Sequence, residues 1–263
     1  MMSPRVLSAE LRKTAALPAA LVAVGVVVVG SIAITVLNSF SVRNAIRSGR
    51  SELIASTSPV EVVFSVVPIG TVGAVVLGVV AVSSEYTANS SDAGGGRQIT
   101  ATLAATPRRL AVLAAKAHSV VLIVFATAVV TIPACLAVAH LVVGEAAPAA
   151  DDLAEMVARS VGAALYWTLT GLIAVAVTVL TRNGIVPLVV LVANSSLLSV
   201  SLLLSNLIPL ARYLPDLAGI RLFARDSIAL DHPLDPLTGG LVMAAWAMGA
   251  LVVSAVVFTR RDA

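Results

Sequence analysis

The sequence predicts an all-α integral membrane protein with six transmembrane helices, and three observations lead to this prediction. Hydrophobic residues make up 59% of the 263 residues, and charged residues only 12%, against roughly 25% in soluble domains. The mean hydropathy is +1.01, so most of the chain has lipid as its solvent. Aromatic residues, at 4%, are too few for the aromatic girdles of a membrane β-barrel.

Six apolar runs approach or exceed the length of about 20 residues that a spanning helix needs, because the bilayer offers no water to backbone groups. They are approximately residues 17–37, 62–82, 113–143, 161–180, 186–208 and 239–258. Pro18 falls in the first turn of the first run, where its missing N–H is harmless, whereas Pro68 should kink the second run or shift its start. The first run resembles a signal peptide, but it is too long and no small-residue cleavage site follows, so we expect a retained anchor. We therefore treat residues 1–263 as a single transmembrane domain.

The distribution of basic residues predicts that both termini are cytoplasmic. With that orientation the inner segments hold ten Lys or Arg and four Asp or Glu, a net charge of +6, and the outer segments hold seven Arg and ten acidic residues, a net charge of −3. Arginine outnumbers lysine fifteen to two, which is typical of a GC-rich bacterial genome, so we expect a multi-pass protein of the bacterial cell membrane. The basic residues lack the interleaved aromatic residues of a single-strand binder, so no nucleic-acid partner is expected.

The chain contains no motif for an intramembrane or ATP-hydrolysing enzyme. It has no Walker A sequence, no H-E-x-x-H and no serine framed as G-x-S-x-G. His118 and His140 lie on the same apolar run, His232 lies in a loop, and Cys135 is the only cysteine, so no metal-binding cluster is predicted. We expect no catalytic, cofactor-binding or metal site. Ionisable residues also avoid the middle of the spans, which argues against a proton relay.

The outer segments are of two kinds. Residues 38–61 and 144–159 are expected to form polar caps, and Asp152 and Glu155 in the second cap predict a short helix with an acidic first turn. Residues 209–238 are more apolar and alternate arginines with large hydrophobic residues. This pattern favours an amphipathic helix, interfacial or re-entrant, although an ordinary outer loop is an equal alternative.

The inner segment 83–111 is the most informative part of the sequence. After Glu85 and Tyr86 it crosses a loose TANSSDAGGG stretch, which is a flexible linker and not a phosphate-binding loop. The next sequence, RQITATLAATPRRLAVLAAK, is divided at Pro107, because the residue before a proline avoids the α region. Residues 98–105 thus form a helix too short to span. Arg108 and Arg109, which follow, are consistent either with anchoring at anionic headgroups or with a place in a docking surface.

At this point the chain resembles the permease subunit of type-2 ABC transporters, whose ATPase is a separate subunit. Four features carry the resemblance: the N-terminal SAELRKTAAL, the segment E-Y…T-x-T-L-A-A-T-P-R-R-L-x-V-L-x-A-K, the six-span layout and the basic FTRRDA tail. The layout covers the whole chain, and the motifs cover about thirty residues. The stretch TANSSDAGGGRQ is longer than the corresponding part of the family's loop.

The resemblance implies a function and a set of partners. Residues 1–16 would form an amphipathic lead-in helix on the inner membrane face, and the short helix in 83–111 would be a coupling helix that docks on the ATPase subunit, which binds ATP and Mg²⁺. The implied coupling residues are Glu85, Tyr86, Arg97, Thr100, Thr102, Thr106, Arg108 and Arg109. Two permease copies, identical or different, would form the path by which an amphipathic or hydrophobic drug, antibiotic, peptide or lipid is exported. The alternative is a solitary structural or assembly membrane protein without transport activity.

The fifth apolar run is the richest in small polar residues. On a continuous helix they fall along two adjacent stripes: Asn194, Ser195, Ser199, Ser201, Ser205 and Asn206. Lipid offers such groups no partners, so the stripes should face protein or water. One hypothesis places them along the translocation path at the dimer axis. The other makes them ordinary hydrogen-bonding contacts between helices of one bundle.

Overall fold

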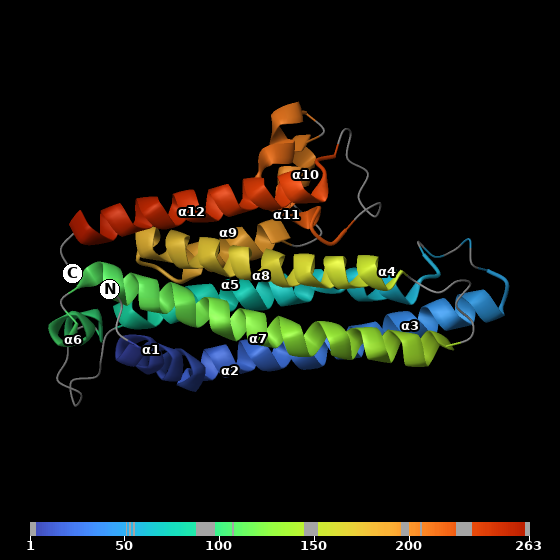
Figure 1. Ribbon diagram of the computed structural model, residues 1–263, viewed down its shortest axis with the longest axis horizontal. Coiled ribbons are helices and arrows are strands. Elements are labelled where there is room, and N and C mark those ends of the chain that lie inside the picture. Colours follow the sequence, from blue (N-terminus) through green and yellow to red (C-terminus); the bar gives the residue numbers. More distant parts are fainter. Residues whose placement is uncertain are drawn as a thin grey trace.

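The computed structural model describes residues 4–50, 52, 54, 56–87, 98–106, 108–144, 152–195, 200–205, 207–224 and 233–260, and all regular elements within them are helical. The long helices lie side by side in an elongated bundle (Figure 1). Five of them are long and apolar enough to cross a membrane: Pro18–Arg47, Pro59–Tyr86, Arg109–Val143, Leu153–Thr181 and Pro236–Arg260. The prediction of an all-α, multi-pass membrane protein is therefore confirmed at this level.

The first span is one continuous helical rod, preceded by the separate helix α1 (Pro4–Ala16). The rod consists of α2 (Pro18–Gly25), a π turn η1 (Val26–Gly30) and α3 (Ser31–Arg47). The expectation of an outer loop from residue 38 is wrong, because the helix continues to Arg47. Val42 and Ile46, four residues apart on this helix, pack there with Val62 and Val143. The contact of the first span with its neighbours therefore continues beyond the apolar run that ends near residue 37.

The second span is interrupted near its outer end, as Pro68 predicts. It consists of α4 (Pro59–Phe64), α5 (Val67–Ser83) and the 3-10 turn η3 (Ser84–Tyr86). The break lies at Ser65–Val66, just before the proline, which lacks an N–H and restricts the residue that precedes it. Ser58 caps α4 by accepting the backbone N–H groups of Val60 and Glu61.

The third and fourth spans are α7 (Arg109–Val143) and α8 (Leu153–Thr181). Asp152 accepts the N–H of Ala154 and Glu155 lies in the first turn, so the acidic helix start is confirmed. The helix is not short, however: it is the start of α8, and the predicted polar cap does not reach residue 159. α5 packs most extensively on α8, and a Cβ at Gly78 would lie 2.4 Å from the carbonyl oxygen of Gly171. Small residues thus bring these two backbones together.

Within the fifth predicted run, the described residues form two helices. α9 (Ile185–Ser195) is followed by the separate helix α10 (Val200–Ser205), and Asn194 Oδ1 accepts from the backbone N–H of Ser201 at 3.4 Å and from its hydroxyl at 3.2 Å. Such side-chain bonds offer the backbone an alternative to the helix. α9 packs on α5, whereas α10 and η6 (Pro209–Tyr213) project from the side of the bundle (Figure 1).

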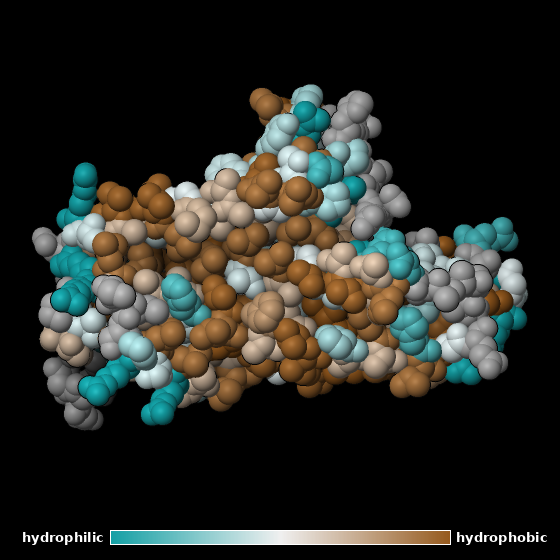
Figure 2. Space-filling model, viewed as in Figure 1, coloured by the Kyte–Doolittle hydropathy of each residue, from teal (hydrophilic) through white to brown (hydrophobic). Residues whose placement is uncertain are grey.

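Residues 209–238, for which the sequence left an amphipathic helix and an ordinary outer loop as equal alternatives, form short helices in their described part. α11 (Pro215–Ile220) follows η6 and packs on α12 (Pro236–Arg260), the last span. Figure 1 places α1, the end of α12 and the short helix α6 (Gln98–Ala105) at one end of the bundle, hereafter the α6 end, and the end of α3 at the other, the α3 end. Figure 2 shows an apolar surface between the two ends and hydrophilic residues gathered at them.

Candidate functional site

Four ionisable residues form a largely buried cluster at the α6 end. Glu10 and Lys13 come from α1, Glu85 from η3 and Lys116 from α7, and we call them the charge cluster. Lys116 Nζ lies 2.7 Å from Glu85 Oε1 and 2.9 Å from Glu10 Oε2. Lys13 donates to the same Glu85 oxygen. Glu10, Glu85 and Lys116 are 6%, 1% and 4% exposed.

Each member of the cluster is positioned by a simple local feature. Glu10 and Lys13 are three residues apart on α1 and so share one face of it. Lys116 lies two turns into α7, and its ammonium group also donates to the carbonyl of Ala81 at 3.3 Å. All three of its donors therefore have acceptors, which is what a buried ammonium requires. With two positive and two negative members, the cluster is neutral, and it joins α1, α7 and the end of the second span.

The short helix α6 is attached to the same cluster. The hydroxyl of Thr102 donates to Glu85 Oε2 at 3.0 Å, and Ile99 is 3% exposed. Beside them lies a small pocket with room for about one water-sized sphere, which Ile99, Glu85, Lys116 and Phe258 line. The opposite face of α6 is exposed and consists of small residues: Thr100, Ala101, Ala104 and Ala105. α6 therefore rests on the bundle with one face and presents a flat surface with the other.

The predicted coupling residues are only partly brought together. Glu85 and Thr102 are in direct contact, and the guanidinium of Arg182 lies 5.9 Å from the centre of the Tyr86 ring. Arg109 donates to the carbonyl of Phe258 at 3.2 Å and so joins α7 to α12. Of the other predicted coupling residues, Thr100 and Arg108 are exposed at this end and Thr106 directly follows α6. Arg97 lies outside the described residues.

Three members of the charge cluster were not predicted as site residues: Glu10, Lys13 and Lys116. From the sequence, all three counted only as charges on the inner side of the membrane. A usable signal was present, because Lys116 interrupts an otherwise apolar stretch and would be expected to have a buried partner. The spacing of Glu10 and Lys13 on an amphipathic helix pointed the same way.

The predicted translocation residues lie at the division between α9 and α10. Asn194 and Ser201 contact each other, and the Ser205 hydroxyl donates to the carbonyl of Leu202 at 2.7 Å. Ser195 ends α9, while Ser199 and Asn206 lie outside the described residues. The two stripes assumed a continuous helix and stay a prediction, because residues 196–199 lie outside the described part; Asn194 and Ser201 do contact each other.

A second charged group lies at the α3 end. Arg159 of α8 is 5% exposed. Its NH1 lies 2.5 Å from Glu61 Oε1 and its Nε 2.7 Å from the carbonyl oxygen of Phe223. The guanidinium also lies 4.2 Å from the centre of the Phe64 ring. Arg159 therefore joins the second span, the fourth span and the segment that precedes α12. The sequence had placed Glu61 and Arg159 in polar outer segments.

No protein-family model matches the chain, and no curated protein matches it in sequence. Among the described residues, no three His, Cys, Asp or Glu side chains are grouped as metal ligands would be. The α6 end can act as a mechanical connection, because the buried carboxylate of Glu85 binds the short helix α6 through Thr102, the third span through Lys116 and α1 through Lys13.

Proposed function

We propose that the chain is the permease subunit of an ATP-driven ABC exporter, coupled to a separate ATPase subunit. The observation that carries the proposal is the attachment of α6: it lies beyond the ends of the spans, presents an exposed face, and is bonded through Thr102 to the buried Glu85. This arrangement supports the sequence resemblance on which the proposal also rests.

The connection is suited to transmit a force from α6 to the bundle. Glu85 follows α5 directly, so a displacement of α6 acts first on the second span. Through Lys116 it acts on the third span, and through Lys13 on α1, which leads into the first. Because packed helices move as rigid bodies, a docked ATPase that moved α6 would move three spans together.

The proposed topology has both termini in the cytoplasm of a bacterium. Arg5, Arg12, Arg108, Arg109 and Arg182 all belong to the α6 end, which the positive-inside rule assigns to the cytoplasm. The N- and C-terminal ends of the chain both lie at this end (Figure 1). The chain must therefore cross the membrane an even number of times. We propose that α9, α10 and the residues between them complete a sixth crossing.

The proposed cargo is amphipathic or hydrophobic and crosses between two permease copies. In the described part of the chain, the ion pairs lie near the two ends of the bundle and none lies at its middle, which does not favour an ion as cargo. Asn194 and Ser201 would contribute polar groups to the path.

The exposed face of α6 allows a direct test of the ATPase partner. The variant Ala101→Arg/Ala104→Arg changes only exposed residues of α6, and the control Ser48→Arg adds a single arginine at an exposed residue of the α3 end. An ATPase subunit encoded next to this chain should copurify with the wild type and with Ser48→Arg, but not with the α6 variant. The readouts are copurified protein and ATP hydrolysis in the membrane fraction.

Two results would contradict the proposal. One is equal recovery of the ATPase with the wild type and the α6 variant. The other is a monodisperse wild-type protein that retains no ATPase, which would favour the solitary structural or assembly protein.

A further inference from the structure

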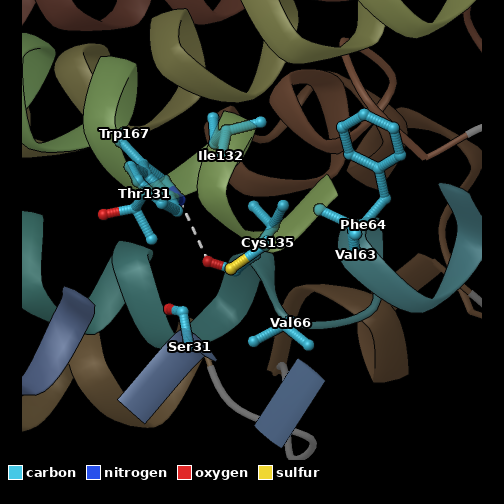
Figure 3. A pocket seen from close by; sticks show the side chains of 9 residues that line it. Ser31, Val63, Phe64, Val66, Thr131, Ile132, Cys135 and Trp167 are labelled. Carbon is cyan, nitrogen blue, oxygen red and sulfur yellow. Dashed lines mark hydrogen bonds between the residues drawn. The ribbon is translucent and has the colours of Figure 1, made fainter. Parts of the chain in front are cut away.

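A small pocket lies inside the bundle where the first, second, third and fourth spans meet. It has room for about one water-sized sphere. Its walls come from Ser31 of α3, the backbone turn between α4 and α5, Thr131 and Cys135 of α7, and Trp167 of α8 (Figure 3). The pocket thus lies beside the break that Pro68 produces in the second span.

Two buried hydroxyl groups line this pocket and have no hydrogen-bond partner in the described part of the chain. Ser31 is 3% exposed and Thr131 is 1% exposed, and the oxygen of each is without a partner. Ser39, two turns further along α3, is also buried without a partner, whereas Thr35, one turn along, interacts with the thiol of Cys135. The unpartnered hydroxyls therefore follow the contact between α3 and α7.

Other buried hydroxyls in the protein behave differently. Those of Thr71, Ser119 and Thr178 each donate to the carbonyl four residues earlier in their own helix, at 2.7–3.1 Å. That is the usual solution for serine and threonine within a helix. Ser31 and Thr131 do not use it, so their hydroxyls are available to a partner in the pocket.

The backbone around the pocket is irregular on two sides. Ser31 directly follows the π turn Val26–Gly30, and such turns are frequent at functional sites. On the other side, the indole N–H of Trp167 donates to the carbonyl of Val67 at 3.0 Å, across the end of the pocket (Figure 3). That donor is already used, so the indole does not satisfy the two hydroxyls.

We propose that this pocket is a water-binding site, in which an ordered water bridges the hydroxyls of Ser31 and Thr131. The pocket has the space of about one water molecule, and it offers a buried water polar partners that otherwise have none. The water joins the first span to the third beside the interruption of the second. This inference does not rest on the transport function, because it needs only the pocket and the hydroxyls that line it.

Cys135 provides the experiment, because it lines the pocket and is the only cysteine in the chain. Its S–H stretching band in the infrared spectrum therefore has a single source, and conversion to S–D after transfer into D₂O reports whether water reaches the pocket. The experiment uses the full chain in lipid nanodiscs. The variants are Ser31→Ala and Thr131→Val, each of which removes one hydroxyl. The control is Thr127→Val, one turn away on α7, whose hydroxyl donates to Ile123 at 2.8 Å.

The wild type and Thr127→Val should exchange at the same rate, and each pocket variant should exchange roughly tenfold more slowly, since a water that loses one of two partners is held less well. Equal rates in the wild type and both pocket variants would overturn the proposal, as would a wild-type thiol that does not exchange. If Thr131→Val does not fold, Ser31→Ala alone decides the result. A high-resolution map provides a second measurement: density between the two hydroxyls supports the water, and hydroxyls turned back onto Val27 and Thr127 in a dry pocket contradict it.

Discussion

Lys116 and Glu85 form an ion pair whose side chains are 5% and 1% exposed, with 2.7 Å between Nζ and Oε1. A buried pair of this kind gains little over well-packed apolar residues, because both charges leave water. Its removal on one side is a different matter, since loss of Lys116 leaves Glu10 buried without this cation and leaves Glu85 with Lys13. The role of the charge cluster is therefore to determine where α1 and η3 lie against α7.

Replacing Lys116 by Met should destabilise the protein by about 3–5 kcal/mol, because Glu85 and Glu10 lose their shared buried cation. The measurement is unfolding of the purified protein in detergent micelles, followed by circular dichroism. His118→Ala is the control, since His118 is an exposed residue on the same helix. Lys116→Met/Glu85→Gln should recover part of the loss, and a single variant as stable as the control would contradict the argument.

Removing the Thr102 hydroxyl should loosen α6 without unfolding the bundle. Thr102→Val deletes the hydrogen bond to Glu85 Oε2, and a bond to a charged group contributes about 1.5–3 kcal/mol. Amide hydrogen exchange within Gln98–Ala105 should accelerate, while exchange in α7 and α8 should not. Ala101→Ser, on the exposed face of the same helix, should exchange like the wild type. Unchanged protection of α6 in Thr102→Val would show that Ile99 alone holds it.

The sequence predicted those features that depend on hydrophobicity and on proline. Five spans follow from apolar runs long enough to cross, the interruption of the second from Pro68, and α6 from its isolation before Pro107. The features that could not be predicted from the sequence depend on which residues, far apart in the chain, contact each other in the fold. Counting charges by side of the membrane cannot show that Lys116 bonds Glu10, which is 106 residues away.

The errors at the element boundaries have a physical cause as well. Hydropathy ended the first span near residue 37, but α3 continues to Arg47 because its neighbours α4 and α7 extend beside it. The two polar stripes predicted for residues 186–208 likewise assumed the periodicity of one unbroken helix. The hydrogen bonds between Asn194 and Ser201 show a local alternative to helical bonding, which hydropathy does not register.

Gly70→Ala should destabilise the contact between α5 and α8. A Cβ at Gly70 would lie 1.9 Å from Cζ2 of Trp167, a ring that is 2% exposed and held by its bond to Val67. Overpacking of a rigid core costs about 1–3 kcal/mol, which should appear as a lower midpoint in thermal unfolding monitored by size-exclusion chromatography. Gly25→Ala is the matched control, because nothing lies within 4 Å of its added Cβ. A Gly70→Ala variant no less stable than that control would refute the prediction.

Arg159→Lys should weaken the α3 end although it conserves charge. The guanidinium donates simultaneously to Glu61 and to the carbonyl of Phe223, and it lies over the Phe64 ring. A lysine ammonium cannot reproduce that planar geometry, so a loss of about 1–3 kcal/mol is expected. Limited proteolysis between residues 207 and 235 should become faster in this variant. Arg47→Lys, at an exposed position of the same end, should leave the cleavage rate unchanged; equal acceleration in both variants would count against the argument.

The first turn of α12 should lose protection at acidic pH because of Asp235. Its Oδ1 accepts the backbone N–H groups of Leu237 and Thr238, each at 3.1 Å. Hydrogen bonds from the Thr238 side chain and from these backbone groups hold the pKa of the carboxyl below its ordinary value. Folding therefore favours the charged form.

The capping contribution should be complete above the pKa of the unfolded chain, about 3.9 for aspartate, and should be lost as the pH falls through the lower pKa of the folded state. Hydrogen exchange of the Leu237 and Thr238 amides, corrected for intrinsic rates, measures it. Asp235→Asn keeps an oxygen acceptor for the cap but removes the titrating group, so its protection should not vary with pH over this interval. Wild-type protection that is equally flat would show that Asp235 does not hold the start of this span, and that Pro236 and the packing of α11 on α12 suffice.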